Sequence, residues 1–177
     1  MTVVYPDAIP TLGNTKVKAV VAIADMLLPK LATEINAASS VDISCFLYPA
    51  GWSPTGSTAK GTKPLRLCNK SAQEQLNRTT YSLADLQYVY APQGVAAAPA
   101  NAAKTLLASG TSIYLVERLG LDSDDTPFVV GQLTRVHYVT LGDQIVGGDR
   151  TDENGEFMIM QAAVYRGAGP VDGTIAT

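Results

Sequence analysis

The stretch "LTRVHYVTLGDQIV" at residues 133–146 decides the fold, because it is apolar on both faces of a predicted β-strand. Side chains of a strand alternate between its two faces with a period of two. Val139 and Leu141 therefore share one face, while Val136 and Tyr138 lie on the other. Typical strands contain roughly five or six residues. The sequence thus predicts an unusually long strand that needs cover on both sides.

Two neighbouring segments repeat this pattern: "TSIYLVER" at residues 111–118 and "EFMIMQAAVYR" at residues 156–166. A one-sided sheet would leave one of their apolar faces in water. A second layer or a neighbouring subunit must cover it. We therefore predict a mainly β fold.

Shorter elements complete the prediction. Strand character appears in "KVKAVVAI", "VDISCFLY", "LRLC" and "RTTYSLADLQYVYAP". The segment "LATEINAAS" at residues 31–39 is consistent with a short helix. The best helix signal is "PANAAKTLLASG" at residues 99–110, with Pro99 in the first turn, many alanines, and Gly110 at its end. We also expect Asn154-Gly155 to form a hairpin turn between the last two long strands.

The segment "PAGWSPTGSTAKGTKP" at residues 49–64 is dense in Gly, Pro, Ser, Thr and Lys and predicts a long loop. Loops of this length are usually functional or disordered. Trp52, the only tryptophan, could pin the loop locally or anchor a neighbour. We predict a single domain over residues 1–177 with this loop and flexible termini.

The charge is low and unevenly distributed. Charged residues make up 16 % of the chain, against roughly 25 % in an average domain. Residues 1–110 hold nine Lys or Arg and six Asp or Glu, whereas residues 117–156 hold three and nine. The basic and acidic parts of the chain could each form a solvated face. Alternatively, they could form complementary surfaces between subunits, or the acidic part could line a channel. The net charge of −3 argues against a nucleic-acid binder, which needs a basic surface.

The sequence offers no motif for catalysis, a metal or a cofactor. Cys45 and Cys68 lack zinc-site spacing, and we expect two reduced, buried thiols. His137 lies within a strand without a nucleophile motif, which favours a structural role over a catalytic one. The most apolar run, "AVVAIADMLL", is too short to span a membrane. The N-terminus lacks the features of a secretory signal, so we expect synthesis in a reducing cytosol.

Five segments in order resemble the major tail tube proteins of long-tailed bacteriophages with non-contractile tails, especially those of actinobacterial hosts. The match extends over about 100 residues, and none of the segments is a catalytic signature. They are "VDISCFLYPAGWSPT", "RLCN", "YVYAPQG", "LLASGTSIYLVERLGL" and "FVVGQLTRVHYVTLGDQ".

This resemblance implies a β-sandwich or small barrel with one packed α-helix, whose long strands extend to form sheets between subunits. It implies a virion protein whose hexameric rings stack into a hollow tube, through which phage DNA passes without specific binding. It also implies tape measure, tail terminator and baseplate proteins as partners. We place ring-to-ring contact in the 49–64 segment, with Trp52, Pro54, Lys60 and Lys63, and in both termini. We place lumen-facing charge at Asp143, Asp149, Asp152, Glu153 and Glu156.

Other classes remain as alternatives. A capsid decoration or tail-completion protein would share the low charge and β content, but it would stay monomeric or form a closed ring. A carbohydrate-binding β-sandwich would group exposed aromatic residues on one face, whereas the tyrosines here are scattered through the strands. An enzyme is the weakest alternative, because no acid-base pair is evident.

Overall fold

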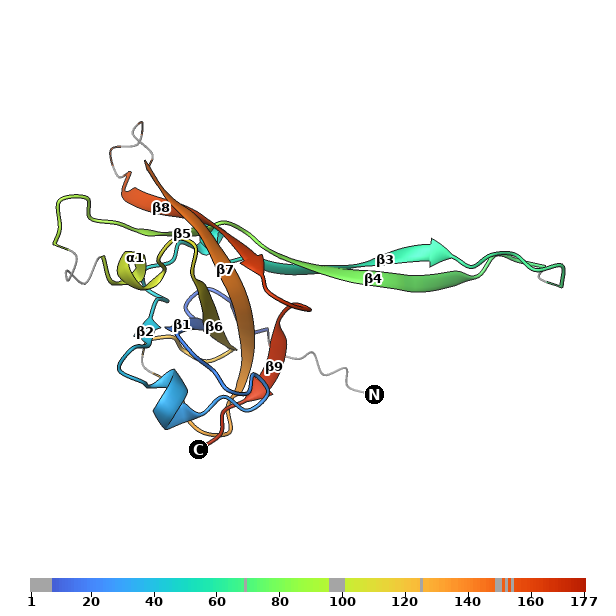
Figure 1. The fold of residues 1–177 in the computed structure, drawn as a ribbon, viewed down its shortest axis with the longest axis horizontal. Helices are drawn as coiled ribbons and strands as arrows, with labels where there is room; N and C mark the ends of the chain where they lie inside the picture. The colour runs from blue at the N-terminus through green and yellow to red at the C-terminus, as the bar shows by residue number, and fades with distance from the viewer. Residues whose placement is uncertain are drawn as a thin grey trace, which may run out of the picture.

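In the described part of the chain, seven antiparallel strands form one curled sheet (Figure 1). The computed structural model describes residues 8–68, 70–95, 101–124, 126–148, 151, 153 and 155–177. The strands lie in the order β2-β1-β6-β7-β8-β5, and β9 pairs with the beginning of β7. Their bounds are β1 Thr15–Val20, β2 Val41–Asp42, β5 Leu86–Val89, β6 Ser112–Leu119, β7 Leu133–Gly148, β8 Phe157–Tyr165 and β9 Val171–Thr174. The prediction of a mainly β fold is confirmed.

The three long strands β6, β7 and β8 lie where the sequence predicts them, with ends that differ by one or two residues. β7 pairs with β6 through residues 135–140 and with β8 through residues 139–148. Its register with β8 shifts between Leu141 and Gln144. Such a bulge bends a strand and increases its twist. One 16-residue strand therefore connects the two halves of the curled sheet.

Each face of the sheet has its own apolar cluster. The larger cluster includes Ile113 and Leu115 of β6, and the smaller one includes Val116 from the opposite face of the same strand. The smaller cluster is closed by three side chains from segments outside the long strands, namely Ile35, Phe128 and Ile175. Much of the cover that the two-faced strands require thus comes from the same chain.

One apolar face stays open in the described structure. Ile145 of β7 is 61 % exposed and pairs with Met160 of β8, and Val164 is 67 % exposed. Met160 and Val164 point to the same side of β8, because they are four residues apart on a strand. The outward side of the β7–β8 pair is therefore an exposed apolar surface.

The predicted helix is present but short. α1 spans Ala102–Leu106, and Ala103 and Leu107 are fully buried in the larger cluster. The side chain of Asn101 fixes the start of this helix by accepting a hydrogen bond from the amide of Ala91 and donating to nearby carbonyl groups. A five-residue helical turn, Leu31–Ile35, replaces the helix expected over 31–39.

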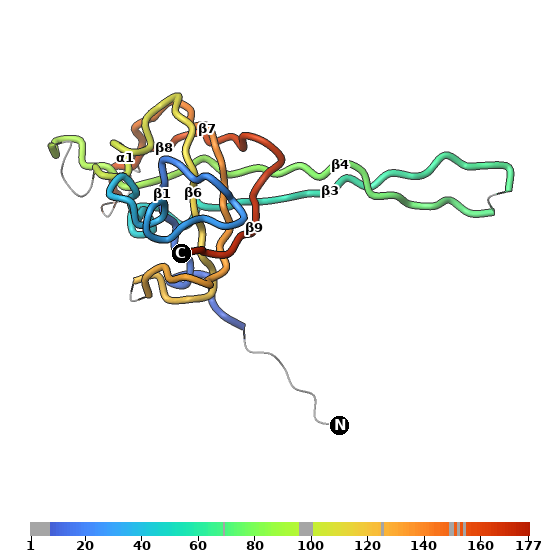
Figure 2. The backbone as a smooth tube through the Cα atoms, turned by 60° about the horizontal axis from the view of Figure 1, so that its bottom comes forward, coloured from blue at the N-terminus to red at the C-terminus, as the bar shows by residue number. Residues whose placement is uncertain are grey.

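The interpretation of residues 49–64 as a loop is wrong from Pro54 onward. A short helical turn occupies Pro49–Gly51, and β3 (Pro54–Thr62) then pairs with β4 (Glu74–Leu83) in a separate two-stranded sheet. The hairpin projects far from the body in both views (Figures 1 and 2). The sequence did not reveal β3, because this strand buries neither face and so carries no apolar alternation. The second half of β4 lies within the strand expected from "RTTYSLADLQYVYAP". We call residues 54–83 the arm.

Four other expectations are corrected. Cys45 and Cys68 are exposed and lie outside strands, so they are not buried strand thiols. The strand expected over 41–48 ends at Asp42, whose carboxylate accepts hydrogen bonds from the amide and hydroxyl of Ser44 and turns the chain. The segment "LRLC" forms part of the turn at the arm tip. The C-terminal segment is not frayed, since β9 pairs with β7 and Ala176 bridges to Lys30.

Candidate functional site

The arm is the most conspicuous feature of the surface. From Thr55 to Ser82, both of its strands are exposed along nearly their whole length. At about 3.3 Å per residue, its strands extend roughly 30 Å. A two-stranded hairpin alone in water is at best marginally stable. The arm therefore has the properties of an element that is completed by a partner surface.

Hydroxyl side chains connect the two strands of the arm. The hydroxyl groups of Thr58 and Thr79 lie 2.9 Å apart, and those of Thr55 and Ser82 lie 2.8 Å apart. Gly56 lies opposite Tyr81, whose ring would be 3.0 Å from a Cβ atom at that position. Cross-strand pairs of this kind each contribute roughly 0.2–1 kcal/mol. The arm thus has local order without a core.

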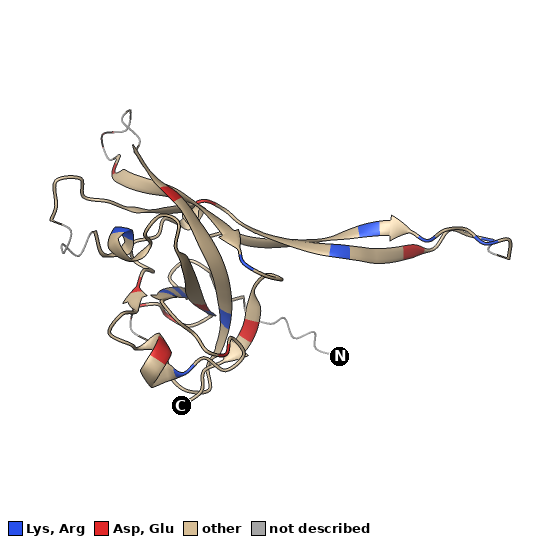
Figure 3. Ribbon diagram, viewed as in Figure 1, with Lys and Arg blue, Asp and Glu red and all other residues tan. Residues whose placement is uncertain are grey.

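The arm is also the basic part of the molecule. Residues 54–83 contain five Lys or Arg and one Glu, which gives a formal charge of +4. Because the net charge of the whole chain is −3, the remaining residues carry a formal charge of −7. In Figure 3, basic residues are spaced along the arm and acidic residues are concentrated on the body. Opposite charges of this size favour contact between the arm of one copy and the body of another.

A buried polar network holds the arm at its root. The indole N–H of Trp52 donates to Oε1 of Glu117 at 2.6 Å, and Nε2 of His137 lies 3.3 Å from Oε2 of the same carboxylate. The hydroxyl of Tyr165 lies 2.8 Å from Nδ1 of His137. Trp52 also packs edge-on against His137, with ring centroids 5.2 Å apart. Trp52, two residues before the arm begins, is thereby fixed to the centre of the sheet.

The carboxylate of Glu117 is stabilised in its ionised form. Burial by itself would raise the pKa of Glu117, but the hydrogen bonds from His137 and Trp52, together with the electrostatic interactions with His137 and Arg135, outweigh burial and lower it. Burial and the nearby charge of Glu117 raise the pKa of Tyr165 to about 12, so its phenol stays neutral. Because Glu117 is only 3 % exposed, losing one of these donors would leave a buried charge with too few partners.

Close backbone packing completes the root. A Cβ atom at Gly51 would overlap the backbone nitrogen of Gln87, so only glycine lets this turn lie against β5. Gly169 has a φ of +116° and lies against the ring of Tyr81, which itself packs edge-on against Tyr165. The arm therefore leaves the body in a defined direction.

The predicted ring-to-ring residues all belong to the arm or its root. Trp52 and Pro54 lie together at the root, whereas Lys60 and Lys63 lie on the outer part of the arm and its turn. Sequence reasoning found this segment through Trp52 and the length of the presumed loop. It did not find Glu117 or its link to His137, because the residues of the network come from segments far apart in the chain.

The predicted lumen residues are only partly described. Asp143 is exposed at the bulge of β7, and Glu153 and Glu156 are exposed between β7 and β8. The carboxylate of Glu156 accepts a hydrogen bond of 2.6 Å from the hydroxyl of Tyr48. Asp149 and Asp152 lie outside the described residues. Whether these carboxylates face a lumen stays a prediction.

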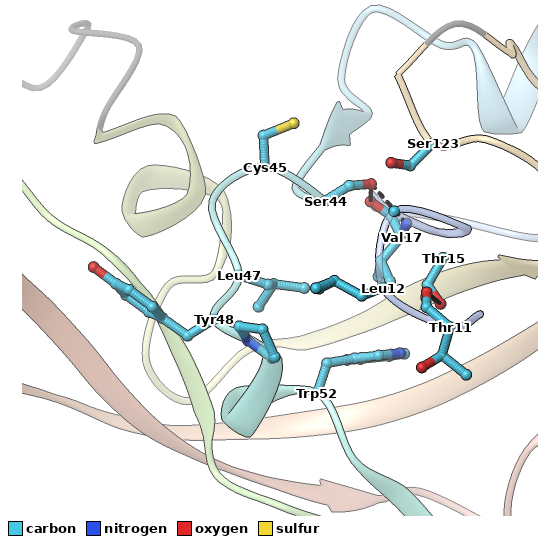
Figure 4. Close-up of a pocket in the computed structure, with 12 residues that line it drawn as sticks. Thr11, Leu12, Thr15, Val17, Ser44, Cys45, Leu47, Tyr48, Trp52 and Ser123 are labelled. Carbon is cyan, nitrogen blue, oxygen red and sulfur yellow. Dashed lines mark hydrogen bonds between the residues drawn. The ribbon is translucent and has the colours of Figure 1, made fainter.

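A groove opens beside the root of the arm (Figure 4). It has a volume of about 400 Å³, and its apolar lining includes Leu12, Val17, Leu47 and Trp52. In Figure 4, the side chains of Leu12 and Leu47 lie next to each other in the groove, and the Trp52 ring lies at its lower side. We call this site the root groove.

The described residues contain neither a metal-binding cluster nor a membrane-spanning helix. No group of three or more His, Cys, Asp or Glu side chains in that part of the chain could hold a metal ion. No helix there is long and apolar enough to cross a membrane.

Comparison with known proteins gives one finding. The family model described as "Phage tail tube protein" matches residues 2–177. A search of curated proteins found no match. The family match covers almost the whole chain and includes both the curled sheet and the arm.

Proposed function

The chain belongs to the phage tail tube protein family, and from this premise we propose that its copies close into hexameric rings that stack into a hollow tube for DNA passage. Membership in this family makes the protein a structural component of the virion tail that assembles with copies of itself. The further proposals are that the tail is long and non-contractile, and that the protein is made in the host cytoplasm before assembly.

The observation that carries the proposal is the uncovered arm. Between Thr55 and Ser82 its strands, β3 and β4, bury almost no surface in the described structure, although an isolated hairpin is marginally stable. A neighbouring copy would supply the missing surface. We propose that the arm makes the ring-to-ring contact through Lys60 and Lys63 on its outer part, while Trp52 and Pro54 set its direction from the root.

The open apolar face of β7 and β8 supports contact between copies within a ring. Ile145, Met160 and Val164 are exposed on the same side of the sheet. Moving an aliphatic side chain of this size from water into an interface contributes about 1.5–3 kcal/mol. A ring repeats one heterologous contact until it closes. This face therefore suits the repeated contact inside each ring.

The interior of the tube would carry negative charge. We propose that Asp143, Asp149, Asp152, Glu153 and Glu156 face the lumen, where carboxylates repel the phosphates of passing DNA. Tape measure protein would occupy this lumen during assembly, and tail terminator and baseplate proteins would contact its ends. The excess of acidic residues in 117–156 supports this placement.

The proposal is tested by electron microscopy of the purified, concentrated protein, with its mass in solution measured in parallel. A matched variant removes the arm by replacing residues 56–81 with Asn-Gly, a two-residue hairpin turn between Thr55 and Ser82, which pair in the structure. We expect tubes or stacked rings from the wild type, and folded single rings or monomers from the variant. Tubes that form equally without the arm would contradict the arm's role. Closed rings that never stack would favour a decoration or tail-completion protein.

A further inference from the structure

The apolar side chains at the tip of the arm are unusually exposed. Leu65 is 67 % exposed and Leu67 is 110 % exposed, at the end of an arm whose shaft is mainly Thr, Ser, Gln, Asn and charged residues. Exposed apolar side chains that lie close together are typical of interaction sites. Lys63 and Arg66 flank these leucines, and no acidic residue occurs from position 54 to position 73. The tip is thus an apolar knob with basic neighbours.

The root groove has the complementary properties. Its lining is mostly apolar, and its volume of about 400 Å³ falls in the range of roughly 300–1,000 Å³ that is typical of occupied binding pockets. Ser123 lines its edge between Asp122 and Asp124, and the carboxylate of Asp124 lies 3.6 Å from the thiol of Cys45 at the same edge. The groove is therefore an apolar hole with an acidic rim.

We propose that Leu65 and Leu67 of one copy insert into the root groove of the next copy. This inference rests on the proposed function and names the residues of the contact that the arm makes. The basic neighbours of the leucines would face the acidic rim around Ser123. Burial of two leucines in a preformed pocket gives the contact an apolar centre with a charged border, as in stable protein interfaces.

The geometry also explains why such a contact would repeat. The knob and the hole lie at opposite ends of the arm, which holds the tip far from the body of its own chain (Figures 1 and 2). A chain therefore cannot fill its own groove. A contact between two different surfaces that leaves a knob free at one end and a hole at the other continues into an open filament. This is the behaviour that tube growth requires.

The two native cysteines provide the test. Cys45 lines the root groove, and Cys68 follows Leu67 at the arm tip; both are exposed. Assembled tubes are treated with a short bis-maleimide crosslinker, denatured, digested and analysed by mass spectrometry. We expect crosslinks between Cys45 of one copy and Cys68 of another, and a ladder of crosslinked oligomers on a denaturing gel. Cys45→Ser and Cys68→Ser are the matched controls, and each alone should abolish the ladder.

The outcomes separate this inference from the proposed function. Tubes without a Cys45–Cys68 crosslink would overturn the inference and leave the proposed function intact. Crosslinks only between two Cys45 or two Cys68 residues would also overturn it, because they indicate a symmetric contact. If no tubes form at all, the proposed function fails and the inference with it.

A pair of variants gives an independent check. In Leu65→Ser/Leu67→Ser the tip loses its apolar side chains, and we expect loss of tubes with an unchanged melting temperature, because both leucines are exposed. Leu76→Ser is the control, since Leu76 is 75 % exposed on the arm shaft. Tubes should form with this control. Loss of tubes in both variants to the same degree would contradict a specific knob at the tip.

Discussion

The body and the arm are both antiparallel β-structure, but they are stabilised differently. Body strands such as β6 alternate fully buried side chains on two faces, whereas the arm strands bury almost nothing and rely on backbone pairing and hydroxyl contacts. The body can thus fold by its own apolar burial. The arm has the same hydrogen-bonding pattern without that source of free energy, which indicates that its stable form includes a partner.

The largest expected difference between the two regions is in the loss of unfolding free energy when a leucine is replaced by alanine in each of them. Leu115→Ala removes a fully buried side chain from the larger cluster and should lower the free energy of unfolding by about 2–5 kcal/mol. Leu76→Ala, on the arm, should change it by less than about 0.5 kcal/mol. Urea unfolding of the unassembled protein measures both. Equal losses would contradict the distinction between a self-supporting body and an uncovered arm.

A smaller effect is expected where the two regions meet. Trp52→Phe keeps an aromatic ring but removes the N–H that donates to Glu117. A hydrogen bond to a charged group contributes about 1.5–3 kcal/mol, and we expect a loss of that size in the free energy of unfolding. A double-mutant cycle with Glu117→Gln isolates the pair. Strictly additive losses would mean that the hydrogen bond does not couple arm root and sheet.

The smallest expected effect is a change in the pH dependence of stability. The pKa of Glu117 is lowered from 4.5 in the folded protein, so its contribution is fully present above pH 4.5 and is lost as pH falls through the folded-state pKa. When the pH is lowered from 6 to about 3, the free energy of unfolding should therefore fall less in Glu117→Gln than in the wild type. Chemical unfolding at several pH values provides the comparison.

Asp172 serves as the surface control for this measurement. Its pKa is also lowered, chiefly by the hydrogen bond from Arg135, but its side chain is 75 % exposed. Exposed ion pairs contribute only about 0–1 kcal/mol. Asp172→Asn should therefore alter the pH profile less than Glu117→Gln does. A larger effect from Asp172 would contradict the assignment of the main acid-sensitive group to the root of the arm.

The sequence by itself determined the body's long strands and the resemblance to tail tube proteins. Residues 111–118, 133–146 and 156–166 were recognisable because apolar side chains on both faces of a strand give a long, nearly continuous apolar run that is visible in a single sequence. The structural role of His137 followed from its place inside such a strand, and the side chain is fully buried. The apolar pattern of a buried strand lies within a few consecutive residues, so it can be recognised from the sequence alone.

The tertiary structure decided the hairpin of the arm, the root network and the root groove. The expected strand "RTTYSLADLQYVYAP" overlaps the second half of β4, but β3 buries neither face and leaves no periodic signal. Only the pairing of positions such as Gly56 and Tyr81 therefore defines the hairpin. The network joins Trp52, Glu117 and His137 across long stretches of chain, and the groove likewise combines residues from separate segments. Contacts between distant segments depend on how the sheet curls, which no local pattern in the sequence encodes.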